Sequence, residues 1–183
     1  MPPLDYKQFE DYAFSLVHAI PYYVYEGIAS IFCLGLVVFI AWKGFKTGLR
    51  YSAALLLIEY IFLLFCSTVI FRPTGETRQY DFHPFWSYDR PELLVENIMN
   101  VIVFIPVGMI LGLLLRVKGS WLVALLIGCS ISITIEALQF WFMKGFSEVD
   151  DVMHNTVGCI MGYIIYSILV RIFTNTKLKL YYA

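Results

Sequence analysis

The sequence predicts an all-α membrane protein, a bundle of five transmembrane helices with its amino terminus outside the cell and its carboxyl terminus in the cytoplasm. This fold class is predicted by three features: the composition, the spacing of apolar runs and the distribution of basic residues. Of the 183 residues, 60% are hydrophobic and 15% are charged, with a net charge of −1 and a mean hydropathy of +0.72. Soluble domains average about 45–50% apolar and about 25% charged residues. This composition excludes a typical soluble enzyme, a disordered chain and a basic nucleic-acid-binding protein.

Five apolar runs are long enough to cross a bilayer, which takes about 20 residues in a helix. The predicted spans are 22–42, 51–71, 93–115, 121–142 and 152–173. No internal repeat or linker divides the sequence, so we expect one membrane domain over residues 1–183. Residues 1–20 mix aromatic and acidic side chains, and we expect a short surface helix there.

Lysine and arginine predict the orientation, because cytoplasmic loops of membrane proteins carry an excess of them. Segments 43–50, 116–119 and 171–179 contain several basic residues and neither Asp nor Glu. The segments on the opposite side, 72–92 and 144–151, hold basic and acidic residues together. The rule therefore places 72–92 and 144–151 outside.

Three predicted spans carry polar stripes near their outer ends, formed by residues three or four positions apart, which share a helix face. One such residue, Glu136, lies about 10 Å below the predicted outer boundary at about 1.5 Å per residue. An unpaired charge near the centre of a bilayer costs at least about 2.5–3.5 kcal/mol. We therefore expect this carboxyl group to be protonated, paired or facing a wet cavity.

The stripes have two interpretations. They line a shared polar cavity that opens outward, or they form a hydrogen-bonded clasp between helices. The stripe residues predicted to line the cavity are Glu96, Asn100, Glu136, Gln139, Asp151 and Asn155. Their amides and carboxylates combine hydrogen-bond donors with acceptors.

Three arginines in the longest predicted outer loop, Arg72, Arg78 and Arg90, also have two interpretations. They are solvated loop charges, or together they contact a phosphate or lipid headgroup. Glu59 lies in the middle of the second span, away from the stripes, and we expect a neutral packing residue with satisfied hydrogen bonds.

Helix packing is predicted from small residues and one proline. Gly108 and Gly112 form one GxxxG pattern, and Gly158 and Gly162 form another. Such patterns let helix backbones approach closely, and we expect packing within the chain. Pro106 removes one helical hydrogen bond, so we expect the third span to bend and to open space beside the stripe.

No cofactor is predicted. The four cysteines are widely spaced, and the sequence contains neither CxxC nor a Cys/His cluster. A divalent cation bound by the carboxylates stays open, because oxygen ligands suit hard cations.

Several strings resemble the VanZ-like family of bacterial membrane proteins: HPF at 83–85, ENIMNVIVFIPVG at 96–108, SISITIEALQF at 130–140 and EVDDVMHNTVGCIMGY at 148–163. The resemblance covers roughly residues 50–170. The residues that match family motifs are Asn97, Asn100, Pro106, Gly108, Glu136, Gln139, Asp150, Asp151, Asn155, Gly158 and Gly162. The resemblance adds Asn97 and Asp150 to the residues predicted to line the polar cavity. The family often has an arginine before its aspartates, where this chain has Gly145 next to Lys144.

The resemblance implies a multi-pass plasma-membrane protein of a Gram-positive bacterium. The founding member is associated with reduced susceptibility to teicoplanin, and the family has no assigned reaction. The leading hypothesis is therefore a non-catalytic factor at the outer leaflet that lowers susceptibility to teicoplanin-type glycopeptides or similar envelope-active agents. Its expected partners are the bilayer and a lipid-linked cell-wall precursor or glycopeptide, with no nucleic acid.

The alternative hypothesis is a membrane enzyme acting on a lipid or glycolipid headgroup, with Glu136 and Asp151 as acid and base or as cation ligands. The sequence lacks a recognisable nucleophile–histidine arrangement, which favours the first hypothesis. A transporter is less favoured because many carriers consist of duplicated halves. A scaffold for a partner complex would tolerate polar substitutions wherever folding survives.

Overall fold

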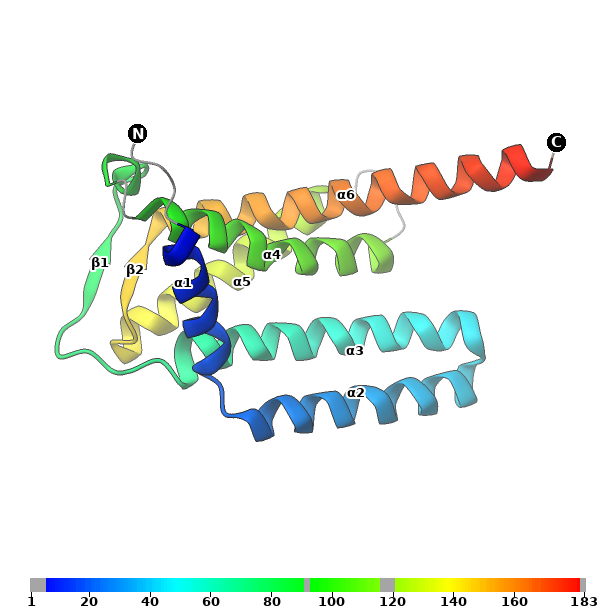
Figure 1. Ribbon diagram of the computed structural model, residues 1–183, viewed down its shortest axis with the longest axis horizontal. Coiled ribbons are helices and arrows are strands. Elements are labelled where there is room, and N and C mark those ends of the chain that lie inside the picture. The colour runs from blue at the N-terminus through cyan, green and yellow to red at the C-terminus, as the bar shows by residue number, and fades with distance from the viewer. Residues whose placement is uncertain (1–5, 91–92, 116–120, 182–183) are drawn as a thin grey trace.

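The computed structural model describes residues 6–90, 93–115 and 121–181, and it consists mainly of helices aligned along one axis (Figure 1). The elements in chain order are α1 (Tyr6–His18), α2 (Tyr22–Lys43), α3 (Phe45–Phe65), the π-helical turn η1 (Cys66–Ile70), β1 (Gln79–Asp81), the 3-10 turn η2 (Trp86–Asp89), α4 (Leu94–Leu115), α5 (Trp121–Phe142), β2 (Phe146–Glu148) and α6 (Val149–Tyr181).

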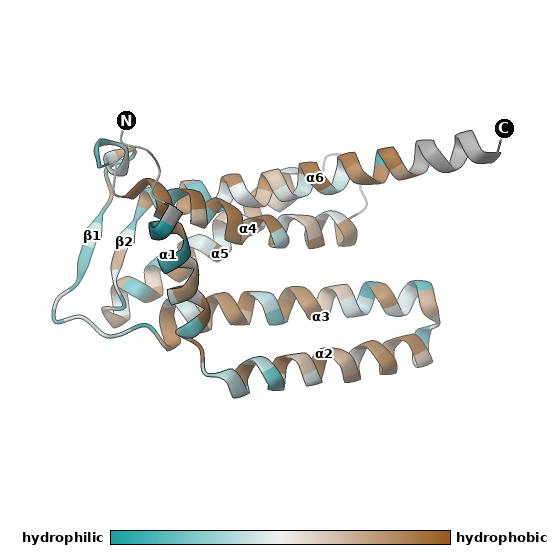
Figure 2. Cartoon of the chain, in the orientation of Figure 1, coloured by the Kyte–Doolittle hydropathy of each residue, from teal (hydrophilic) through white to brown (hydrophobic). Residues whose placement is uncertain are grey.

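Within the described residues, five helical segments are long and apolar enough to cross a membrane, which confirms the predicted helix bundle. They are Tyr22–Lys43, Phe45–Ile70, Leu94–Leu115, Trp121–Phe142 and Val149–Phe173. Helix α1 confirms the short helix expected before the first span. Hydrophobic residues dominate the long helices, while hydrophilic residues gather around α1, β1 and β2 (Figure 2).

The second span begins earlier than the sequence predicted, at Phe45, because the link between α2 and α3 is very short. Gly44 alone separates the two helices, and it has a φ of 74° that favours glycine. Its N–H donates to the Ile40 carbonyl at 2.9 Å and its carbonyl accepts from the Gly48 N–H at 2.8 Å. The predicted basic loop 43–50 is therefore mostly helix.

The two ends of the bundle differ in character. At one end, Lys46 and Arg50 lie in the first turns of α3, and Arg50 donates to the Leu114 carbonyl at the end of α4. Segment 116–119, which contributed to the predicted orientation, lies outside the described residues. At the other end, the fifth span begins at Val149, three residues before its predicted start. The predicted orientation would place that second end outside the cell.

Helices α4 and α6 form the most intimate contact of the bundle. A Cβ atom at Gly108 would overlap the Cys159 carbonyl, and a Cβ at Gly162 would overlap the Ile105 carbonyl. Gly158 is likewise pressed against the Val101 carbonyl. The two helices thus touch through their backbones, as the GxxxG patterns predicted.

The rest of the core follows from this pair. Gly112 lies against the ring of Tyr166, and α4 continues through Pro106 to Leu115. The buried core cluster comprises Leu64, Val69, Phe104, Val107, Leu111, Ala124, Ile135 and Cys159. Helix α2 stands apart, since none of its residues is buried, and α3 is its main packing partner.

Two loops and α1 meet at the end of the bundle opposite Gly44. Strands β1 and β2 pair in parallel, with Gln79 opposite Phe146 and Asp81 opposite Glu148. This pairing ties the long segment after α3 to the short link between α5 and α6. Helix α1 lies across the same end and contacts α4 and η1 (Figure 1). Segments distant in the sequence thus surround one region.

Candidate functional site

A cavity of about 230 Å³ lies at this end of the bundle, between α1, η1, α4, α5 and α6. Its polar lining comprises Tyr12, Ser15, Ser67, Thr68, Arg72, Glu96, Asn100, Glu136, Gln139, Asp151 and Asn155. Side chains such as Phe104 and Ile135 close it toward the apolar core. We refer to it as the polar cavity.

One wall of the polar cavity carries two carboxyl groups, each held by a neighbour. Asn100 donates from Nδ2 to Asp151 Oδ1 at 2.7 Å, which joins α4 to α6. The Tyr12 hydroxyl donates to Glu96 Oε1 at 3.3 Å, which joins α1 to α4. Burial and the nearby carboxylates of Glu96 and Asp151 raise the pKa of the Tyr12 hydroxyl, which therefore stays protonated as a donor.

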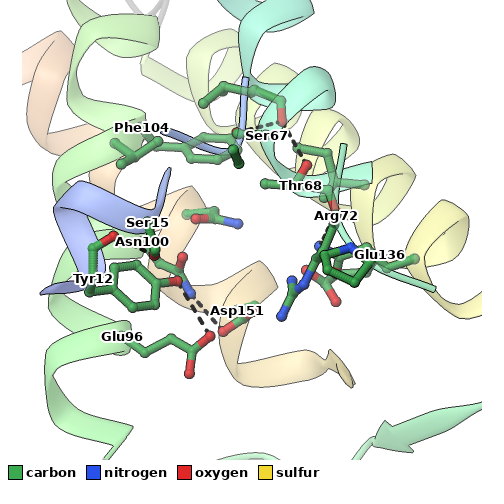
Figure 3. A pocket seen from close by; sticks show the side chains of 17 residues that line it. Tyr12, Ser15, Ser67, Thr68, Arg72, Glu96, Asn100, Phe104, Glu136 and Asp151 are labelled. Carbon is green, nitrogen blue, oxygen red and sulfur yellow. Dashed lines mark hydrogen bonds between the residues drawn. The ribbon is translucent and has the colours of Figure 1, made fainter. Parts of the chain in front are cut away.

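The opposite wall contains Glu136 and Arg72, whose side chains lie next to each other in Figure 3. The Glu148 N–H donates to Glu136 Oε2 at 3.0 Å, and the Ser147 hydroxyl donates to the Glu136 carbonyl at 3.1 Å. Strand β2 therefore fixes the position of this carboxyl group.

Arg72 is held in place by the link between α5 and α6. A Cβ atom at Gly145 would lie 2.5 Å from the Arg72 Cζ, and Gly145 has a φ of 119°. Lys144 donates from Nζ to the Arg72 carbonyl at 2.9 Å. Lys144 thus supports the backbone of Arg72, and the guanidinium fills the space that a side chain at 145 would need.

Two buried amides complete the lining. Gln139 is 3% exposed and donates from Nε2 to the Thr68 carbonyl at 3.2 Å, but its Oε1 has no hydrogen-bond partner. Asn155 donates from Nδ2 to the Ser132 hydroxyl at 2.8 Å. Asn155 therefore joins α6 to α5, as a clasp would, whereas Gln139 leaves a buried acceptor unused.

Asp150 and Asn97, which we predicted in the polar cavity, are not among its lining residues, and this prediction was wrong. The Asp150 carboxylate is fully buried and accepts from the Phe85 N–H at 2.6 Å, the Ser87 N–H at 3.0 Å and the Ser87 hydroxyl at 2.6 Å. Asn97 donates to the same hydroxyl at 3.0 Å. We call Asp150, Asn97, Phe85 and Ser87 the loop anchor.

The loop anchor holds an unfavourable backbone conformation. Phe85 has a φ of 68°, which is costly for a residue with a side chain, and its N–H donates to the Asp150 carboxylate. Adjacent residues of α6 point about 100° apart around the helix axis. Asp150 therefore reaches the loop while Asp151 faces the polar cavity.

Only one of the three predicted headgroup arginines lines the polar cavity. Arg78 lies over the ring of Phe140, with its Cζ 5.7 Å from the ring centre, and Arg90 lies over Trp86 at 4.8 Å. Cation–π contacts of this kind hold a guanidinium against an aromatic ring. Arg78 and Arg90 thus contact aromatic rings and are not among the residues that line the polar cavity, and their contact with a phosphate or headgroup stays a prediction.

Some residues reach the polar cavity from outside the three stripes and were not predicted from the sequence. Tyr12 comes from α1, and Ser67 and Thr68 come from η1. The two hydroxyls near the end of the second span were a weak signal, because polar residues are rare within spans. Tyr12 had no local signal, since its contact with Glu96 joins residues 84 positions apart.

Glu148 links the polar cavity to the loop. Trp86 donates from Nε1 to Glu148 Oε2 at 3.1 Å. Burial, followed by the carboxylates of Glu96 and Asp150, raises the pKa of Glu148 to about 7.

Glu59 differs from its expectation. It is buried in α3, and neither of its carboxyl oxygens has a hydrogen-bond partner. The expectation of satisfied hydrogen bonds was therefore wrong. In the described parts of the chain, no group of three or more His, Cys, Asp or Glu side chains is arranged to hold a metal ion.

The chain is similar to known proteins over the region that contains most of this site. A family model described as VanZ/LLP1 matches residues 52–171, which include all the polar residues listed above for the polar cavity except Tyr12 and Ser15. Protein VanZ of Enterococcus faecium is 35% identical over 83 residues, which are 45% of this chain and 51% of that protein. The chain thus spans about half the length of the curated relative it matches. No solved structure matches. These matches confirm the resemblance that the motifs predicted.

Proposed function

Because the chain belongs to the VanZ/LLP1 family and is a multi-pass bacterial membrane protein, we propose that it lowers the susceptibility of the cell to teicoplanin-type glycopeptides. It acts at the outer leaflet of the plasma membrane by binding the headgroup of a lipid-linked envelope component. The observation that carries this proposal is the polar cavity, a small space lined by three carboxyl groups and an arginine at one end of an apolar bundle.

The lining supports a binding site better than a clasp alone. A clasp would pair its polar groups with one another, because an unpaired buried polar group is costly. Asn155 and Ser132 behave in this way. Gln139, which lines the cavity, does not, because its buried Oε1 has no hydrogen-bond partner.

The size of the polar cavity restricts what enters it. Sites for drug-sized ligands measure roughly 300–1,000 Å³, and this space is about 230 Å³. It accommodates a single headgroup, whereas a glycopeptide antibiotic is much larger. The proposed protection therefore acts through the envelope component and not by enclosing the drug.

The position of the polar cavity supports an outer-leaflet role. It lies at the end of the bundle away from the Gly44 link, and the basic residues Lys46 and Arg50 lie near that link. The positive-inside rule favours the cytoplasm for the basic end. We propose that residues 1–183 act as one membrane domain, since Tyr12 joins the cavity from outside the family match.

The test is expression in a susceptible Gram-positive host. We expect a higher inhibitory concentration of teicoplanin and less labelled teicoplanin bound per cell. Glu136→Gln and Asp151→Asn should abolish both effects while membrane levels of the protein stay normal. Glu10→Gln, which removes an exposed carboxylate from α1, is the matched control and should retain both. Unchanged drug binding by expressing cells would contradict the proposal.

A second candidate function, a membrane enzyme on the same headgroup, is favoured by the grouping of Glu96, Glu136 and Asp151 around one space. Carboxyl groups so placed can act as acid and base. Mass spectrometry of envelope lipids from expressing and non-expressing cells separates the two functions. A new covalent lipid species, lost in Glu136→Gln, would indicate chemistry.

A further inference from the structure

The polar cavity has few free donors. The hydroxyl hydrogens of its lining are already committed to protein acceptors: Tyr12 to Glu96, Ser15 to the Tyr12 carbonyl, and both Ser67 and Thr68 to the Leu64 carbonyl. Each lining amide nitrogen also donates one of its two hydrogens to a protein oxygen. The donors left for a ligand are the second hydrogens of these amides and the Arg72 guanidinium.

Acceptors are in excess in the same space. The carboxyl groups of Glu96, Glu136 and Asp151 each have one side-chain oxygen bound by a protein donor, and a carboxylate accepts about four hydrogen bonds. Independently of these acids, Gln139 lines the cavity, and its buried Oε1 lacks a hydrogen-bond partner. The unmet requirement of the polar cavity is thus for hydrogen-bond donors, and three carboxyl groups favour donors that carry positive charge.

The positive charge in the lining is confined to one place. Arg72 is the cationic residue among the described side chains that line the cavity, and it lies beside Glu136. Glu96, Asn100 and Asp151 lie together on the facing wall (Figure 3). A ligand with its cation near Glu96 and Asp151 and an anion near Arg72 would match both walls.

From this arrangement we propose that the polar cavity binds a primary ammonium group joined to a phosphate, the chemistry of a phosphoethanolamine headgroup. The inference rests on the proposed function, since it names the class of headgroup that the same site takes. The ammonium donates to Glu96, Asp151 and Gln139 Oε1, and the phosphate contacts the Arg72 guanidinium. A primary ammonium offers three N–H donors, whereas a trimethylammonium group offers none.

The experiment is competition among lipids for the purified full-length protein in detergent, read by native mass spectrometry. The probes are phosphatidylethanolamine, phosphatidylcholine, phosphatidylglycerol and diglucosyl diacylglycerol with identical acyl chains, at equal concentrations. We expect phosphatidylethanolamine to be retained about tenfold over each of the others, the worth of a charge-assisted hydrogen bond. Glu96→Gln and Asp151→Asn should each remove this preference, and Glu10→Gln should keep it.

A second variant tests the phosphate half separately. Arg72→Gln should weaken retention of phosphatidylethanolamine about tenfold while leaving retention of octadecylamine, an amine without phosphate, unchanged. If any variant fails to fold, as judged by its thermal unfolding, the lipid ranking of the unaltered protein decides the proposal.

Each contrary outcome has a distinct meaning. Equal retention of phosphatidylcholine would overturn the requirement for N–H donors. Equal or better retention of phosphatidylglycerol or the glycolipid would show that hydroxyl donors suffice; it would overturn the ammonium and leave the proposed function standing. If the cavity variants alter the retention of none of the four lipids, headgroup binding itself fails, and the proposed function fails with it.

Discussion

Helices α4 and α6 meet in two different ways along their length. In the middle of the bundle, Gly108, Gly158 and Gly162 bring the two backbones into direct contact. Toward the end near α1, Asn100 and Asp151 join the same helices through a 2.7 Å hydrogen bond beside a cavity. Close backbone packing fixes the relative position of the helices, and the side chains beyond it can then be held around an open space. Close backbone packing and the polar cavity thus occupy neighbouring stretches of one helix pair.

The largest expected effect comes from disrupting the close packing of α4 and α6. In Gly162→Ala the new Cβ meets the Ile105 carbonyl, a backbone atom that cannot move aside. We expect a loss of about 2–4 kcal/mol of unfolding free energy or failure to accumulate, measured by thermal unfolding in detergent. Gly27→Ala is the control, because no atom lies within 4 Å of the added Cβ, and it should be neutral or slightly stabilising. An equally mild result at both positions would refute close packing.

The next-largest effect distinguishes the roles of the adjacent residues Asp150 and Asp151. Asp150→Asn replaces a charged acceptor of three hydrogen bonds in the loop anchor, and we expect a loss of about 1–3 kcal/mol. Hydrogen exchange at the Phe85 and Ser87 amides should accelerate. Asp151→Asn should leave that exchange unchanged while removing teicoplanin protection. Equal acceleration of this hydrogen exchange by both substitutions would contradict the separate roles of the two aspartates.

A smaller effect sharpens the distinction between binding site and clasp. Gln139→Met removes one hydrogen bond to the Thr68 carbonyl and also removes the unpartnered Oε1. The two contributions oppose each other, so we expect a stability change within about 1 kcal/mol together with loss of lipid preference. A large loss of stability with the lipid preference intact would favour the clasp.

The smallest effect is a dependence on pH at the junction of the polar cavity and the loop. Burial raises the pKa of Glu148 to about 7, so the folded protein holds this proton more tightly than the unfolded chain. Stability is therefore full below about pH 4.5 and falls as the pH rises through about 7. Allowing for solvent screening, we expect a change of about 1 kcal/mol. Glu148→Gln should flatten this part of the pH profile in denaturation experiments; an unchanged slope would assign it to another group.

The polar stripes show which residues of the candidate site could be predicted from the sequence. Spacing along one helix was enough to place Glu96 with Asn100 and Glu136 with Gln139, because a helix repeats every 3.6 residues. The six stripe residues Glu96, Asn100, Glu136, Gln139, Asp151 and Asn155 do line one cavity. Spacing was not enough for Asp150 and Asn97, whose direction depends on a loop more than 60 positions away from Asp150.

The sequence by itself determined the five apolar spans, the family and the glycines that permit close approach, because these depend on local composition and helical period. Tertiary structure decided which polar residues share a space. It placed Tyr12 of α1 beside Glu96 and Arg72 against Gly145, and it directed Asp150 to Ser87 in the loop anchor. Each of these contacts joins residues far apart in the chain, and such pairings follow from how whole elements pack, which no local pattern encodes.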